Sequence, residues 1–256
     1  MELNFVPILA SLGSGLATGL GALPIFMKKD FSKESLDVGM GFSAGIMLVA
    51  AFLSLIVPGL DHARALYGSV YGILPVLLGV FSGYLSIILL HDFLPHEHLI
   101  KKKDMGHKQN LSRITLIILA IALHNIPEGL TVGVGLGVGS SASGLLLAAA
   151  IGLQNMPEGL VVALGLLTAG ASKKRAFTIA LLSGAIEPIA AGVGYLATQV
   201  AASTLPFAMG FAGGAMLFVI CQEIFPEIFR QGSERKTTFG VISGISLMLA
   251  LNFIFG

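Results

Sequence analysis

Two copies of one polar motif interrupt the apolar sequence of this protein. His124-Asn-Ile-Pro-Glu-Gly-Leu130 recurs as Gln154-Asn-Met-Pro-Glu-Gly-Leu160. In a helix, His124 and Glu128 lie on one face because they are four residues apart. Imidazole, carboxylate and amide groups gathered in this way are ligands for a borderline divalent ion such as Zn²⁺, with Fe²⁺ and Mn²⁺ as alternatives. The repeated motif therefore predicts a metal site.

A third acidic residue, Glu187, joins Glu128 and Glu158 in the middle of otherwise uncharged stretches, and residues 114–172 and 176–229 contain no Lys or Arg. A charge at the centre of a bilayer costs about 2.5–3.5 kcal/mol or more and is functional by default. The three carboxylates are therefore either protonated or joined by a cation, and the ligand spacing favours the cation. Two alternatives stay open, a polar network that only ties helices together and a protonated Glu187 that donates a hydrogen bond between helices.

The composition excludes a soluble domain. Of the 256 residues, 55% are hydrophobic and 11% charged, against a usual charged share of about 25%. The net charge of +1 does not suggest a nucleic-acid partner. Uncharged runs are long enough to cross a bilayer as helices of about 20 residues. We therefore expect an all-α polytopic membrane protein, a single transmembrane domain over residues 1–256 whose partner is the lipid bilayer.

The runs and the turn signals between them divide the chain into eight transmembrane helices. Fourteen of the fifteen Lys and Arg residues fall in alternate loops and only Arg64 in the opposite ones, which places both termini outside the cytoplasm by the positive-inside rule. The expected spans are 4–27, 38–60, 68–91, 112–138, 144–170, 176–200, 205–229 and 237–255.

Two internal similarities indicate inverted repeats. The polar motif relates span 4 to span 5, and Met40-Gly-Phe-Ser-Ala-Gly-Ile-Met-Leu48 resembles Met209-Gly-Phe-Ala-Gly-Gly-Ala-Met-Leu217, which relates span 2 to span 7. We therefore expect spans 1–3 to be related to spans 6–8. Each related pair crosses the membrane in opposite directions, an arrangement that transporters use to open one site to either side in turn.

Weaker candidate ligands lie around the central motif. Met47, close to the middle of span 2, could contribute a soft thioether, although plain packing is the simpler interpretation. Glu223 follows the middle of span 7 by about 9 Å of helical rise toward the cytoplasm, and His91 and Asp92 end span 3 on that side. These three residues would form a transport pathway from the midplane to the cytoplasm.

At these motifs the chain resembles the ZIP (Zrt-, Irt-like protein) family of divalent metal transporters, in particular its prokaryotic, GufA-like branch. The resemblance implies homodimers and an elevator-like motion of spans 1, 4, 5 and 6 against spans 2, 3, 7 and 8. It also implies a binuclear site, with one ion held by His124, Glu128, Gln154, Glu158 and Met47, and a second by Asn125, Glu128, Asn155, Glu158 and Glu187. Many relatives have His in place of Gln154 and some have Asp in place of Asn155, so this site carries less negative charge than theirs.

The expected function is transport of Zn²⁺, and of related ions such as Fe²⁺, Mn²⁺, Cd²⁺ or Co²⁺, across the cell membrane into the cytoplasm. The ion is substrate, and no cofactor is expected. An intramembrane metalloenzyme is one alternative because a metal beside His and Glu can activate water. The absence of a His-Glu-x-x-His motif argues against an enzyme. A metal-selective channel is the other alternative, and the inverted repeats favour a carrier over it.

Overall fold

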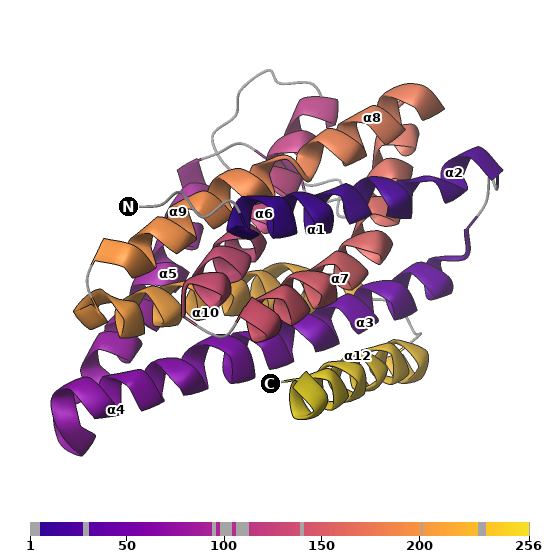
Figure 1. Cartoon of the computed structure of the whole chain (residues 1–256). Coiled ribbons are helices and arrows are strands. Elements are labelled where there is room, and N and C mark those ends of the chain that lie inside the picture. Colours follow the sequence, from indigo (N-terminus) through magenta and orange to yellow (C-terminus); the bar gives the residue numbers. More distant parts are fainter. Residues whose placement is uncertain are drawn as a thin grey trace.

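The chain folds into a bundle of long helices (Figure 1). The computed structural model describes residues 6–27, 31–93, 96–97, 104–105, 113–138, 141–200, 202–229 and 234–255. The elements in chain order are α1 (Val6–Ala22), α2 (Pro24–Met27), α3 (Lys33–Val49), the π-helical η1 (Ala50–Ile56), α4 (Val57–Tyr71), α5 (Ile73–Phe93), β1 (His96–Glu97), β2 (Asp104–Met105), α6 (Arg113–Val138), α7 (Ser141–Thr168), α8 (Lys173–Ser183), α9 (Ile186–Val200), the 3-10 turn η2 (Ala202–Thr204), α10 (Leu205–Val219), the π-helical η3 (Ile220–Ile224), α11 (Phe225–Ile228) and α12 (Glu234–Phe255).

The helices identify a polytopic α-helical membrane protein. Helical segments occupy each of the eight predicted spans. Large apolar side chains face outward, among them Leu9, Phe81 and Phe253, which are 63%, 63% and 91% exposed. In the described part of the chain, Ile73–Leu89 is a shorter apolar helix, and six helical segments are long and apolar enough to cross a membrane: Ile8–Met27, Glu34–Gly68, Gly144–Leu167, Lys173–Val200, Leu205–Ile228 and Glu234–Ile254.

One sequence-based expectation about a loop is wrong. The segment between spans 2 and 3 was expected to form a loop near residues 61–67, but α4 continues to Tyr71 and bends at Gly68, whose φ of 77° is readily adopted only by glycine. Charged residues there lie on a helix because the charge of a side chain does not itself end one. Between spans 3 and 4, the short strands β1 and β2 form an antiparallel pair, with His96 opposite Met105.

The repeat of spans 2 and 7 extends to a local distortion that the sequence did not predict. Each of the two similar motifs is followed by a π-helical segment, η1 after α3 and η3 after α10. Val57 N–H donates to the Phe52 carbonyl and Phe225 N–H to the Ile220 carbonyl, so both helices contain bonds that reach back five residues. A proline, Pro58 or Pro226, follows each distortion and has no N–H with which to continue the regular helical pattern. Such π-bulges are frequent at functional sites.

The helices pack as two groups. The first group consists of α1, α6, α7, α8 and α9, and the second of α3, α4, α5, α10 and α12; the most extensive packing joins α6 to α9 and α1 to α7 in the first, and α5 to α10 and α3 to α12 in the second. In Figure 1, α12 lies along α3 at one edge of the bundle, and α1, α8 and α9 lie on the opposite side.

Glycines allow the backbones within each group to touch. An added Cβ on Gly15 would collide with the Gly184 backbone, and one on Gly83 would collide with the Phe211 backbone. Many other glycines make such approaches within a group: Gly21, Gly133 and Gly159 in the first, and Gly45, Gly79, Gly210, Gly214, Gly240 and Gly244 in the second. Small residues let membrane helices approach this closely.

The seam between the two groups is mostly apolar. One buried cluster joins residues of both groups, including Met47 of α3, Val132 of α6 and Ile151 of α7. At this seam Gly39 of α3 meets the ring of Pro157, where an added Cβ would lie 3.2 Å from the proline Cβ. A hydrogen bond crosses the seam from the buried Ser43 hydroxyl of α3 to the Gln154 carbonyl of α7, at 2.8 Å.

Candidate metal site

The three central glutamates come together from three helices of the first group. Glu128 lies on α6, Glu158 on α7 and Glu187 at the beginning of α9. Glu128 and Glu187 are fully buried, and Glu158 is half-buried. Glu128 interacts electrostatically with both Glu158 and Glu187, and Glu187 also interacts with Glu158. The structure thus brings together the carboxylates that the sequence placed at one depth.

Glu128 and Gln154 form the first half of the polar cluster. Gln154 Nε2 donates a hydrogen bond of 3.0 Å to Glu128 Oε1. Glu128 Oε2 and Gln154 Oε1 are buried and accept no hydrogen bond from the residues that the structure describes. Buried acceptors without donors are uncommon in folded proteins and indicate an unfilled requirement for a donor or a cation.

Asn155 and Glu187 form the second half, which has more internal hydrogen bonds. Asn155 Nδ2 donates to Glu187 Oε1 at 2.8 Å and to the Ser14 carbonyl at 3.0 Å. Ser14 Oγ donates to Glu187 Oε2 at 2.7 Å. Both oxygens of Glu187 therefore act as acceptors, and these bonds do not use Glu187 as the interhelical donor considered above.

Asn125 connects the cluster to the break between α8 and α9. Its Nδ2 donates to the Ser183 carbonyl at 2.8 Å. Because α8 ends at Ser183, this carbonyl belongs to the group of helix-terminal acceptors that lack an intrahelical donor. The interruption of span 6 at residues 184–185 thus leaves a backbone carbonyl free to bind α6, close in sequence to Glu187.

The remaining predicted site residues lie apart from this network or outside the described side chains. Met47 is fully buried in the apolar cluster at the seam. Glu223 is 7% exposed and lies on η3. His124 lies on α6, and His91 and Asp92 lie near the end of α5, but their side chains are outside the described residues. Among the described side chains, no three of His, Cys, Asp and Glu gather closely enough to hold one ion.

Sequence reasoning missed two serines of the site. Ser14 of α1 contacts the Asn155–Glu187 half, and Ser43 of α3 contacts the backbone of Gln154. Both are buried. The only available signal was a hydroxyl within an uncharged span, which is weak because serine is frequent in membrane helices, where it also packs closely and bonds to the backbone.

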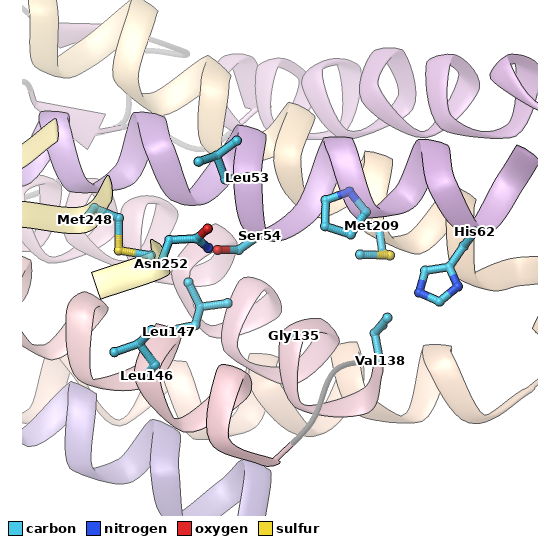
Figure 2. A pocket seen from close by; sticks show the side chains of 11 residues that line it. Leu53, Ser54, His62, Gly135, Val138, Leu146, Leu147, Met209, Met248 and Asn252 are labelled. Carbon is cyan, nitrogen blue, oxygen red and sulfur yellow. The ribbon is translucent and has the colours of Figure 1, made fainter. Parts of the chain in front are cut away.

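A separate cavity of about 280 Å³ opens where the two helix groups meet (Figure 2). It is two helical turns from the polar cluster, since Gly135 follows Glu128 by seven residues on α6 and Leu147 precedes Gln154 by seven on α7. Figure 2 shows the His62 ring and the Met209 side chain near one end, and the polar ends of Ser54 and Asn252 near each other at the other end.

Comparison with known proteins assigns the family. The family model described as "ZIP Zinc transporter" matches residues 91–252. The chain belongs to the ZIP zinc transporter family. It is 40% identical over 250 residues to "Zinc transporter GufA" of Myxococcus xanthus, covering 97% of this chain and 98% of that protein. It is also 39% identical over 254 residues to "Zinc transporter ZIPB" of Bordetella bronchiseptica, covering 97% and 81% of the two chains.

A third relative extends the same pattern. "Zinc transporter ZupT" of Chlorobaculum parvum is 32% identical over 257 residues, covering 96% of each chain. The predicted membership of the ZIP family and the similarity to GufA are confirmed. The protein thus belongs to a family whose members described above are named as transporters and not as enzymes.

Proposed function

We propose that this ZIP protein is a carrier that moves divalent transition-metal ions, Zn²⁺ first among them, into the cytoplasm. One observation carries the proposal. Buried glutamates and amides from α6, α7 and α9 converge, and buried oxygens of Glu128 and Gln154 accept no hydrogen bond from described residues. With no Lys or Arg in residues 114–172, a bound cation would supply the partner that these buried oxygens lack. The relatives named as zinc transporters support zinc as that cation.

The proposed site holds two ions. His124, Glu128, Gln154 and Glu158 would bind the first, with Met47 beside it. Asn125, Glu128, Asn155, Glu158 and Glu187 would bind the second, with Glu128 and Glu158 as bridges. A nitrogen-containing first position suits Zn²⁺, and the oxygen ligands of the second accept a wider range of ions.

The proposed path begins at the cavity of Figure 2. In the proposed topology this cavity would lie on the extracytoplasmic side of the site. Between this cavity and the polar cluster lie buried apolar residues of both groups, among them Met47, Val132 and Ile151. An ion could pass only after these residues separate. On the cytoplasmic side, Glu223, His91 and Asp92 would receive the ion on its way out.

The proposed movement is a sliding of the first helix group, which carries the site, against the second. The packing supports this division, because glycine contacts hold each group together internally whereas the seam is mostly apolar. Apolar surfaces without interlocking backbones can exchange one set of contacts for another at low cost, and rigid-body motion of one bundle against another is the usual basis of alternating access.

The remaining expectations complete the proposal. The chain would form a single domain of eight spans with both termini outside the cytoplasm, embedded in the cell membrane as a homodimer. The outward-facing apolar side chains and the paired distortions of spans 2 and 7 are consistent with the membrane setting and the repeat.

Zinc uptake by liposomes tests the function. Liposomes that contain the purified protein should accumulate radioactive zinc, and the initial rate of uptake should saturate as the zinc concentration rises. Glu128→Ala and Glu158→Ala should each abolish accumulation. Glu34→Ala is the matched control, because Glu34 is an exposed glutamate that pairs with Lys236 far from the cluster. Undiminished uptake by both site variants would refute the site, and flux that never saturates would indicate a channel.

A further inference from the structure

The Ser14 hydroxyl has two acceptors for a single proton. Ser14 Oγ lies 2.7 Å from Glu187 Oε2 and 2.9 Å from the Ser11 carbonyl of its own helix. A hydroxyl carries one hydrogen and two lone pairs, so at any moment it can donate fully to only one of these oxygens. Ser14 is 4% exposed, so water does not replace either partner easily.

The orientation of the Ser14 hydroxyl determines whether its O–H group or its lone pairs face Glu187. When the hydroxyl donates to Glu187, it satisfies the carboxylate and covers one of its oxygens. When the hydroxyl turns to the Ser11 carbonyl, its lone pairs face the Glu187 side. The hydroxyl can therefore keep one donated hydrogen bond in either orientation, because serine hydroxyls in helices commonly donate to such a carbonyl. Glu187 Oε2 loses its donor when the hydroxyl turns, and a bound cation would take the place of that donor.

Packing keeps α1 close enough for this exchange. Gly15, next to Ser14, touches the backbone of Gly184, which lies three residues before Glu187. Gly159 of α7 touches the backbone of Thr18 in the same way. A side chain at either glycine would push α1 away, so the glycines hold the Ser14 hydroxyl within reach of the second half of the cluster.

A further acceptor completes an oxygen ligand set. Asn155 Oδ1 is buried and accepts no hydrogen bond from the described residues, while its Nδ2 donates to Glu187. Ser14 Oγ, Asn155 Oδ1 and the Glu187 carboxylate thus come from α1, α7 and α9 and belong to three side chains that one hydrogen-bonded cluster joins. All are oxygen atoms, which suit divalent ions across the first transition row.

We propose that Ser14 is a ligand of the second ion, one that donates to Glu187 in the arrangement described here and turns its proton to the Ser11 carbonyl when a divalent ion binds. The proposal rests on the two-ion site under Proposed function and adds a residue of α1 to it. It makes Ser14 a determinant of whether the second position fills.

Cadmium binding to a thiol at this position tests the proposal. Ser14→Cys in a Cys221→Ser background would place sulfur where the hydroxyl oxygen lies, and Cd²⁺ bound to it should produce an ultraviolet sulfur-to-cadmium charge-transfer band. Ser86→Cys in the same background is the control, because Ser86 also bonds to its own helix but lies on α5. We expect the band for Ser14→Cys and not for Ser86→Cys.

Ser14→Ala provides a second measurement in the full-length protein. It should weaken binding of the second Cd²⁺ by about tenfold or more, since the loss of even an outer partner of a metal ligand has an effect of that size, while the first ion binds as in the wild type. Calorimetric titration of both proteins gives the two affinities and the number of ions bound.

The outcomes separate this proposal from the proposed function. If the wild type binds no divalent ion, or Glu128→Ala retains all binding, the proposed site itself is wrong. If the wild type binds ions that Glu128→Ala loses, the site stands. In that case a single ion in the wild type, unchanged second-ion affinity in Ser14→Ala, or no band in Ser14→Cys overturns the role of Ser14.

Discussion

The two halves of the polar cluster contain similar residues but differ in their hydrogen bonds. In the Glu128–Gln154 half, one oxygen of each side chain accepts no hydrogen bond from described residues. In the Asn155–Glu187 half, both carboxylate oxygens of Glu187 are hydrogen-bonded. In the proposed site, the first half would receive an ion without giving up a hydrogen bond. In the second half Asn155 Oδ1 also accepts no hydrogen bond from described residues, but Glu187 would have to exchange existing hydrogen bonds for an ion.

Each half of the cluster has a serine partner, and the two serines belong to different helix groups. Ser43 bonds to the Gln154 backbone across the seam. Ser14 bonds to Glu187 within the first group. If the groups slide, the Ser43 bond must break, but the Ser14 bond travels with the site. One serine thus bears on movement and the other on ion binding.

Neutralising one glutamate in each half should give the largest difference. Glu128→Gln should remove both ions and lower zinc uptake by at least about 100-fold, because its carboxylate would bridge them and even outer partners of metal ligands contribute up to that factor. Glu187→Gln should remove only the second ion and lower uptake by about tenfold. Metal content per protein and initial uptake rates measure both effects. Equal losses in the two variants would contradict the division into halves.

Adding a negative charge to the second half should make it less stable without metal and increase its affinity for zinc. Asn155→Asp removes the Nδ2 donor to Glu187 and the Ser14 carbonyl and places a second carboxylate beside the first. The metal-free protein should unfold at a lower temperature, and a tenfold gain in zinc affinity would add about 1.4 kcal/mol of zinc-dependent stabilisation.

Thermal unfolding in detergent with and without zinc measures this change. Asn155→Ala is the matched control, since it removes the same donor without adding charge and should lower the unfolding temperature without any gain from zinc. Equal responses of the two variants to zinc would show that charge does not limit the second position.

The smallest effect is expected at the seam. Ser43→Ala removes one neutral hydrogen bond, worth about 0.5–1.5 kcal/mol net, and should change the saturated uptake rate by about two- to tenfold while leaving metal affinity unchanged. Ser86→Ala serves as the control because its hydroxyl bonds only within α5. A loss of bound metal in Ser43→Ala would mean that Ser43 belongs to the ion site rather than to the seam.

Much of the fold could be predicted because a bilayer imposes simple requirements. A spanning segment must be apolar, long enough, and internally hydrogen-bonded, so charge and turn signals were enough to predict where long apolar helices lie. The continuation of α4 through Asp61 and His62 was missed because charged residues mark a polar surface without ending a helix. The π-helical η1 and η3 were missed because their longer hydrogen bonds leave no distinct sequence pattern.

The candidate site also contains residues that the sequence predicts and residues that it does not. The sequence marks Glu128, Gln154, Asn155 and Glu158 as candidates, because polar residues that recur in apolar spans are costly unless they have a function. Ser14 was not found, because its partner Glu187 is 173 residues away and the residue type alone carries little information.

By itself, the sequence determined the class of protein, the helices, the family and the residues that could bind a cation, since each of these depends on composition, spacing or short motifs. Only the tertiary structure decided which carboxylate oxygens already have donors and which do not. That distinction depends on the approach of α1 and α3 to the motif helices, an approach set by contacts such as Gly15 against Gly184. Hydrogen bonds form or fail within a few tenths of an ångström, a precision that only the packed helices provide.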